Sequence, residues 1–186
     1  MKHQTRRARG LDAGGWTALP PHGPRPLRLR RLLAERRSLT EALSRHGPTT
    51  VAVLRQRPGL PDADELRPMR VAAHQRRMVR EVVLRVDGAP WVFAHTVANA
   101  AGRALLRRAG KRPLAAVLFA DPAVRPGRLH YRRLDARHPL FARAAAWFGG
   151  PAYAAPRAFD ARRALFVRGA ARLLVTEVFI VDARVR

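Results

Sequence analysis

A hairpin pattern at residues 77–99 constrains the fold more than any other feature of the sequence. The stretch reads RMVREVVLRVDGAPWVFAHTVAN, and two apolar-rich runs flank the Asp87-Gly88 pair. An Asp-Gly pair suits a two-residue β-turn, because both turn positions need positive φ. A second pair of apolar runs, RRALFVRGAARLLVTEVFIVD at 162–182, has its turn at RGAA. The sequence therefore predicts an antiparallel sheet that contains two long hairpins.

The remaining elements are expected to be helices and strands that pack with these hairpins. Ser38, with Glu41 three residues later, forms a capping-box pattern that predicts the start of a helix ending at Gly47. Further helices are expected at 27–37, 99–110 and 138–150, a helix or turn at 112–119, and strands at 49–56 and 127–135. Helices followed by antiparallel strands predict an α+β fold: a single domain, with helices packed on an antiparallel β-sheet of about six strands.

Chain length and composition suit one soluble domain. The chain has 186 residues and is 47% apolar, which allows a sizeable core. Residues 1–24 are basic, contain GG and LPPHGPRP and show no period, so we expect a flexible tail before a domain at 25–186. No apolar run reaches the roughly 20 residues that span a bilayer. No apolar segment follows the charged N-terminus as in a secretory signal, so the expected location is the cytoplasm.

The net charge of +24 allows two explanations. One is a nucleic-acid or anionic-membrane partner. The other is a coding bias, because 35 of the 37 basic residues are arginine, alanine is abundant and serine is scarce. The arginines are spread along the whole chain, which favours the bias. A nucleic-acid binder would place clustered cations beside exposed aromatic residues, whereas the aromatic residues here lie in apolar runs, so no specific nucleic-acid partner is expected.

Several kinds of catalytic site lack their residues in this sequence. The chain has no cysteine, which excludes disulfides and thiolate-bound metals. Its seven histidines show neither H-x-x-x-H nor H-E-x-x-H spacing, and there is no Walker A or G-x-G-x-x-G motif. We therefore expect no metal site and no nucleotide or redox cofactor.

Two charged residues occupy apolar strand faces, where a buried charge needs a partner. Side chains alternate between the two faces of a strand. Arg80 shares its face with Met78, Val82, Leu84 and Val86, and Glu177 shares its face with Leu173, Val175, Phe179 and Val181. Glu81 and Arg85 fall on the other face, where solvent is expected. Burying either Arg80 or Glu177 unpaired would cost several kcal/mol.

Two alternatives satisfy these charges. The first is structural: Arg80 and Glu177 form an ion pair, or both reach water at an edge of the core. The second is a closed pocket whose ligand meets the arginine at one end and the glutamate at the other. A planar guanidinium binds both oxygens of a carboxylate. A glutamate in a dry pocket accepts a hydrogen bond from a hydroxyl and, with a raised pKa, exchanges a proton with the ligand.

Four segments, in order, resemble the chorismate lyase family, whose enzymes make 4-hydroxybenzoate for ubiquinone biosynthesis. SLTEAL at 38–43 is similar to the family's Ser-Leu/Met-Thr segment, and VREVVLRVDGAPWVFAHTV at 79–97 to its Arg-Glu hairpin. AGKRPLAAVLF at 109–119 is similar to its Leu-Gly-Lys-x-Pro-Leu-Gly segment. ARRALFVRGAARLLVTEVF at 161–179 resembles its Arg-Arg and Thr-Glu ending. The resemblance covers residues 27–186 and implies a chorismate lyase-like fold.

The resemblance also implies roles for individual residues. Arg80 falls at the position that holds the aromatic carboxylate, and Glu177 at the position that meets the hydroxyl across the ring. The backbone amide of Leu114 would assist with the carboxylate, and Leu39 would close over the ligand. Arg80 and Glu177 are thus the expected catalytic residues, and all four residues are expected to bind the substrate.

The sequence departs from the family pattern at several positions. The family's Ala-Arg-Thr has a histidine here, His95, and its glycine and serine are replaced by Ala115 and Ala164. If the missing arginine contacts the enolpyruvyl carboxylate, His95 can replace it only while protonated. Arg162 and Arg163, which match the family's Arg-Arg pair, are the candidates to compensate.

The implied reaction splits chorismate into 4-hydroxybenzoate and pyruvate, the work of a carbon–oxygen lyase that needs no cofactor. The pocket would fix the ring and the enolpyruvyl group in a reactive geometry and exclude water. We expect a monomer whose partners are chorismate and 4-hydroxybenzoate. The alternative is a non-catalytic sensor domain for small aromatic acids, because the same fold serves as the effector domain of some transcription regulators. Those regulators carry a winged-helix domain first, and a tail of 24 residues is too short for one.

Overall fold

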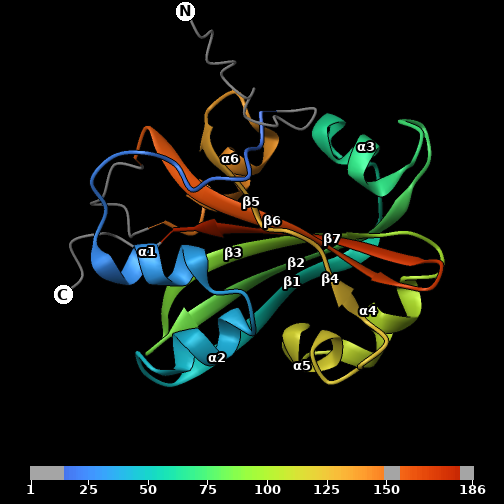
Figure 1. The fold of residues 1–186 in the computed structure, drawn as a ribbon, viewed down its shortest axis with the longest axis horizontal. Helices are drawn as coiled ribbons and strands as arrows, with labels where there is room; N and C mark the ends of the chain where they lie inside the picture. The colour runs from blue at the N-terminus through green and yellow to red at the C-terminus, as the bar shows by residue number, and fades with distance from the viewer. Residues whose placement is uncertain (1–14, 149–155, 181–186) are drawn as a thin grey trace, which may run out of the picture.

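The computed structural model describes residues 15–148 and 156–180, and its centre is a seven-stranded antiparallel sheet. The strands are β1 (Thr49–Gly59), β2 (Arg77–Val86), β3 (Ala89–Ala98), β4 (Arg125–Pro126), β5 (His130–Asp135), β6 (Ala158–Arg168) and β7 (Ala171–Phe179). They lie in the order β1-β2-β3-β7-β6-β4, and β5 pairs with β6 alongside β4 (Figure 1). The α+β fold class is confirmed. The strand beyond the expected six is β4, whose two residues are too few for a sequence pattern.

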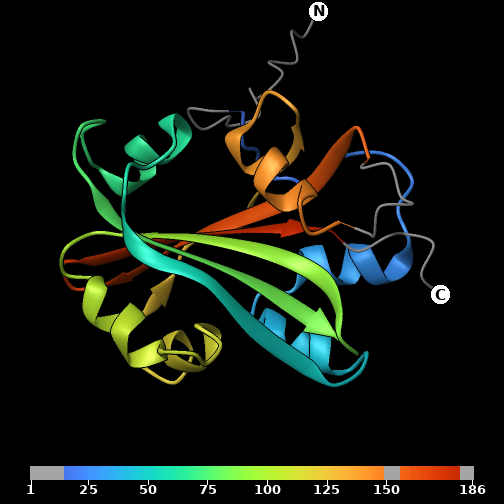
Figure 2. The ribbon, with the colours of Figure 1, turned by 180° about the vertical axis from the view of Figure 1, so that it is seen from behind.

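Helices cover both faces of the sheet. They are α1 (Leu27–Ala34), α2 (Leu39–Ser44), the 3-10 turn η1 (Ala63–Glu65), α3 (Leu66–Met69), α4 (Arg103–Ala109), α5 (Ala115–Leu118) and α6 (Pro139–Ala145). Figures 1 and 2 show α1, α2, α4 and α5 below the sheet and α3 and α6 above it. We call the side of α2 and α5 the near face and the side of α3 and α6 the far face.

Both predicted hairpins are confirmed. The β2–β3 turn has φ values of 49° at Asp87 and 76° at Gly88, the positive values that made this pair a turn indicator. The β6–β7 hairpin closes between Arg168 and Ala171 and has φ of 53° at Gly169. Strands β3 and β7 then pair with each other, so the two hairpins form the middle of one continuous sheet.

The far face is covered, which corrects the expectation that Glu81 meets solvent, whereas Arg85 is half-buried. Glu81 is only 5% exposed, and the guanidinium of Arg85 lies 5.7 Å from the ring centre of Trp147. Helix α6, η1 and α3 pack on this face. Six of the ten residues of β2 are apolar, and Arg80 and Glu81 are buried on opposite faces of the strand. Each of these two charges therefore needs polar partners on its own face.

Trp16 and Thr17 pack against the domain, although they fall within the segment expected to be a tail, whereas most of the other residues from 15 to 24 are exposed. Trp16 is fully buried, and its Nε1 donates a hydrogen bond to Asp64 Oδ2 at 2.6 Å. Thr17 and Tyr131 exchange two backbone hydrogen bonds of 2.9 and 2.8 Å. Such a bridge leaves no periodic pattern, because its partners are distant in sequence. Within the described ranges every helix is too short or too polar to cross a bilayer.

Candidate active site

A cavity of about 640 Å³ lies on the near face, between the sheet and the segments around α2 and α5. Its floor consists of side chains from four adjacent strands: Arg80, Val82 and Leu84, Ala94 and Thr96, Val175 and Glu177, and Arg162, Ala164 and Phe166. The floor is apolar in the middle and charged at opposite sides. This arrangement suits a planar apolar ligand with a polar group at each end.

Five of the seven site residues predicted from the sequence line this cavity. They are Leu39, Arg80, Leu114, Arg162 and Glu177. Arg80 pairs across the sheet with Thr96, and Glu177 pairs with Ala94, so two strand spacings of about 4.8 Å separate β2 from β7. Arg80 and Glu177 therefore share one face, as their alternation predicts, but each has its own protein partners and the alternative Arg80–Glu177 ion pair does not form.

Arg80 presents a free edge of its guanidinium group. The side chain is 2% exposed. Its Nη1 donates hydrogen bonds to Gln56 Oε1 at 2.8 Å and Gly110 O at 2.5 Å, and its Nη2 donates to Arg112 O at 3.0 Å. No carboxylate of the described residues pairs with Arg80. Burial lowers the pKa of its guanidinium group. Three of five donors are used, and the two left, on Nε and Nη2, lie along the edge that fits a carboxylate.

Glu177 is held by Arg162 from the neighbouring strand. The two residues are directly paired across β6 and β7, and Arg162 Nε donates to Glu177 Oε2 at 2.6 Å. Arg162 Nη1 donates to Leu32 O at 2.7 Å and also to Glu35 O, so this side chain ties the end of α1 to the sheet. Among the described residues, Glu177 Oε1 and Arg162 Nη2 have no hydrogen-bond partner, and these atoms remain for a ligand.

Two short helices cover the cavity from different parts of the chain. Leu39 is the first residue of α2 and is buried, and its helix begins where Ser38 Oγ accepts a 3.2 Å hydrogen bond from the Glu41 backbone N–H. Leu114 precedes α5, and its own N–H donates no backbone hydrogen bond within the described ranges. A free N–H at this position can donate to a ligand carboxylate.

His95 and Arg163, the other two predicted residues, lie on the far face and do not line the cavity. His95 alternates with Ala94 and Thr96, and Arg163 alternates with Arg162 and Ala164. Strand alternation could have predicted this placement, because a strand residue between two neighbours that face the cavity must point to the opposite face of the sheet. Arg163 Nη1 instead donates to the backbone and side chain of Asp64, both at 3.2 Å, and its guanidinium stacks 4.3 Å from the ring centre of Trp16.

His95 is the centre of a buried ionic network on the far face. Its Nδ1 lies 2.9 Å from Glu81 Oε1 and its Nε2 lies 3.3 Å from Glu65 Oε1. Burial alone would lower the pKa of His95, but these two carboxylates outweigh burial and raise the pKa to about 9. The imidazole is therefore protonated at neutral pH.

The carboxylates of this network are matched by cations. Arg55 binds Glu81 through two hydrogen bonds of 2.7 Å, and Arg143 bridges Glu81 at 2.8 Å and Asp62 at 2.6 Å. Burial would raise the pKa of Glu81, but His95 and the two arginines lower it to about 2.

Oxygens of Asp62 and Glu65 lie within 4.8 Å of a His95 nitrogen, a spacing that could hold a metal ion. Arg143 and protonated His95 already supply positive charge there, so the residues do not favour a cation.

Solved structures share the fold. The chain resembles the C-terminal domain of a histidine utilization repressor from Pseudomonas syringae pv. tomato, with a TM-score of 0.53 and 13% identity over 75% of this chain and 95% of that chain. It also resembles the effector domain of PhnF from Mycobacterium smegmatis, with a TM-score of 0.52 and 16% identity over 78% and 89% of the two chains. At these identities the likeness shows the fold alone.

Sequence relatives are closer. A probable chorismate pyruvate-lyase of Cupriavidus metallidurans is 40% identical over 95% of this chain and 84% of its own length. A probable chorismate pyruvate-lyase of Thiobacillus denitrificans is 39% identical over 94% of this chain and 92% of its own length. Residues 23–185 match the chorismate lyase family as a whole, nearly the range that the four sequence segments covered. This chain belongs to the chorismate lyase family.

Proposed function

We propose that this protein is a chorismate lyase, which converts chorismate into 4-hydroxybenzoate and pyruvate. The observation that carries the proposal is the cavity itself, which opposes a free edge of buried Arg80 to the carboxylate of Glu177. In the reaction the ether bond between ring and enolpyruvyl group breaks. The ring carbon that bears the hydroxyl loses a hydrogen, and the methylene of the leaving group gains one to become the methyl of pyruvate. Atoms balance without a second substrate, and formation of the aromatic ring drives the step.

Arg80 would hold the ring carboxylate. A guanidinium that is 2% exposed and bonded only to neutral acceptors lacks a counter-charge in the free protein. A ligand carboxylate on its Nε/Nη2 edge supplies that charge with two parallel hydrogen bonds, the strongest geometry available to arginine. The Leu114 N–H lies on the same cavity wall and would add a third donor.

Glu177 and Arg162 would act at the other end of the ring. Glu177 Oε1 is free to accept a hydrogen bond from the ring hydroxyl, and Arg162 Nη2 is free to donate to the neighbouring ether oxygen, which gains charge as the bond breaks. Because Arg162 is anchored on Leu32 O and Glu35 O, this pair is fixed before the substrate binds. Leu39 would close the cavity and exclude water.

Turnover of chorismate by the purified protein tests the proposal. The protein is mixed with chorismate, and 4-hydroxybenzoate and pyruvate are followed by chromatography. Formation of both products in equal amounts, above the spontaneous decay measured without protein, is the expected result. Absence of turnover would refute the lyase function. If 4-hydroxybenzoate then still bound tightly, the cavity would serve the alternative role of a non-catalytic aromatic acid-binding domain.

A further inference from the structure

The substrate of the proposed reaction is a dianion, and the inference here rests on that proposed function. Arg80 offers one free edge, which accounts for the ring carboxylate only. The second carboxylate, on the enolpyruvyl group, needs another cation on the cavity wall. Five arginines and two glutamates line the cavity, so the wall carries a formal charge of +3: Arg36, Arg37, Arg80, Arg128, Arg162, Glu35 and Glu177.

The inner cations do not meet this need. Arg162 already pairs with Glu177 at 2.6 Å and is bonded to the backbone at the end of α1. His95 and Arg163, the candidates from sequence, face the opposite side of the sheet. The remaining cations are Arg36, Arg37 and Arg128, and these lie at the rim.

The rim arginines come from two loops. Arg36 and Arg37 connect α1 to α2, and Arg128 connects β4 to β5. All three are exposed, and within the described ranges none has a carboxylate at ion-pairing distance. Glu35 Oε1 accepts a 2.8 Å hydrogen bond from the Arg37 backbone N–H, so a negative charge already lies beside Arg37. Among the described residues, the side chains of Arg36 and Arg128 form no ion pair, and Arg128 also has no acidic residue beside it in the sequence.

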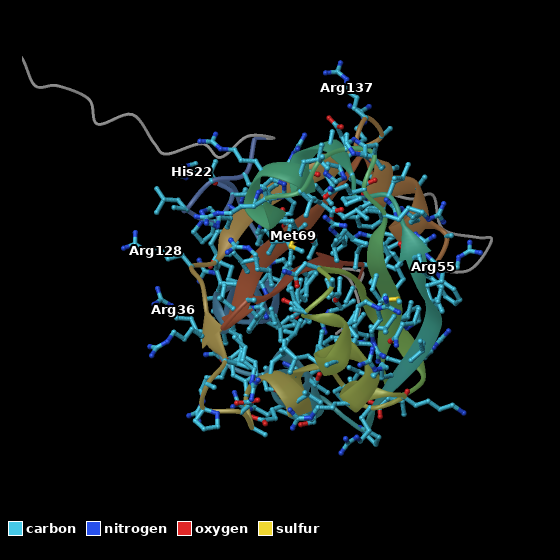
Figure 3. The ribbon with its side chains drawn as sticks, turned by 90° about the vertical axis from the view of Figure 1, so that its right-hand side faces the viewer. His22, Arg36, Arg55, Met69, Arg128 and Arg137 are labelled. Carbon is cyan, nitrogen blue, oxygen red and sulfur yellow. The ribbon has the colours of Figure 1, made fainter. Side chains whose placement is uncertain are left out.

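Arg36 and Arg128 lie on one side of the molecule. Figure 3 shows both side chains projecting from the same side, one above the other. The charge of Arg36 acts on the cavity wall: burial raises the pKa of Tyr131, and the positive charges of Arg162 and Arg36 oppose that rise. Tyr131 lines the cavity together with Arg128 and Leu129. The positive charge of Arg36 therefore acts on a side chain of the cavity wall.

We propose that Arg36 and Arg128 form a cationic mouth that draws in the dianionic substrate and positions its enolpyruvyl carboxylate. Exposed charges act over roughly a Debye length and are screened by salt, so this contribution must weaken as ionic strength rises. The aromatic product has a single carboxylate, which Arg80 takes. The mouth therefore favours the substrate over the product.

The test removes the two charges together, as Arg36→Gln/Arg128→Gln. Turnover is measured at ionic strengths of about 0.01 M and about 0.15 M. We expect KM for chorismate to rise roughly tenfold at low salt, with kcat within about twofold, because exposed ion pairs each contribute modestly. The salt dependence of kcat/KM should largely disappear, and affinity for 4-hydroxybenzoate should stay within about twofold.

Two matched variants separate position from net charge. Arg57→Gln/Arg137→Gln also removes two exposed charges, but neither residue lines the cavity, and Figure 3 shows Arg137 projecting from a different end. This control should keep the KM, the kcat and the salt dependence of the parent. Arg36→Lys/Arg128→Lys keeps the charge and should restore most of the parent KM and its salt dependence.

Direct titration of chorismate binding completes the test. If the Arg36→Gln/Arg128→Gln variant binds chorismate with the affinity and salt dependence of the parent, the proposed mouth is refuted. The proposed mouth is also refuted if the Arg57→Gln/Arg137→Gln control loses as much affinity for chorismate as the Arg36→Gln/Arg128→Gln variant. If the parent does not turn chorismate over, the lyase function is refuted. The titration still decides this inference, because it measures chorismate binding and not turnover.

Discussion

Replacement of His95 by glutamine should remove a pH-dependent part of the protein's stability. His95 is 2% exposed, and its ring nitrogens face Glu81 and Glu65 on the far face. Arg55, Arg143 and Asp62 are the other charged groups that act on this cluster. Glutamine can keep a hydrogen bond to one carboxylate but carries no charge. The variant therefore leaves two buried carboxylates facing a neutral side chain.

The magnitude follows from the pKa of His95. In the folded protein it is about 9, against 6.5 for an ordinary histidine. A difference of about 2.5 units corresponds to about 3 kcal/mol of folding free energy. Because the folded-state pKa is raised, this stabilisation is fully present below pH 6.5, decreases as the pH rises, and is lost above about pH 9.

Denaturant unfolding of parent and His95→Gln, at intervals from pH 6 to pH 10, measures this effect. The difference in the free energy of unfolding should be larger at pH 6 than at pH 10 by about 3 kcal/mol. His74→Gln is the control, because His74 is exposed and lies outside the network, and it should leave the pH profile unchanged. A difference that stays constant across this range would refute the coupling between His95 and its carboxylates.

Three further substitutions test the near face. Arg80→Lys keeps the charge but removes the Nε/Nη2 edge, so calorimetry should show 4-hydroxybenzoate binding about a hundredfold weaker; near-parental affinity would contradict bidentate binding. Glu177→Gln keeps the shape and removes the charge, and steady-state kcat should fall by more than about tenfold; unchanged turnover would rule out a role for the carboxylate. Ser38→Ala removes the cap on α2 and should lower the unfolding free energy by about 1 kcal/mol in a denaturant titration; no change would mean that the 3.2 Å bond to Glu41 contributes nothing.

Local patterns predicted the parts of the fold that depend on neighbouring residues. The Asp87-Gly88 turn, the second hairpin and the start of α2 at Ser38 all rest on short-range chemistry, and the structure has each of them. Strand alternation also placed Arg80 and Glu177 on one face. The geometry of an element's own backbone is enough for such predictions.

The periodicity of the sequence could not predict contacts between segments that are distant along the chain. Trp16 packs with residues more than a hundred positions away, and the backbone acceptors of Arg162 lie about 130 positions earlier. Glu81 was expected in solvent because its alternation gives a face but not what covers that face. His95 was matched to a lost arginine through the family resemblance, although the same alternation assigns it to the far face.

A structure of the protein crystallised with 4-hydroxybenzoate tests the proposed cavity most directly. The ring should lie on the floor formed by Val82, Ala94 and Val175. Its carboxylate should meet the Nε/Nη2 edge of Arg80, and its hydroxyl should lie within hydrogen-bond distance of Glu177. A ring bound in the reverse direction, or outside this cavity, would contradict the roles assigned to both residues.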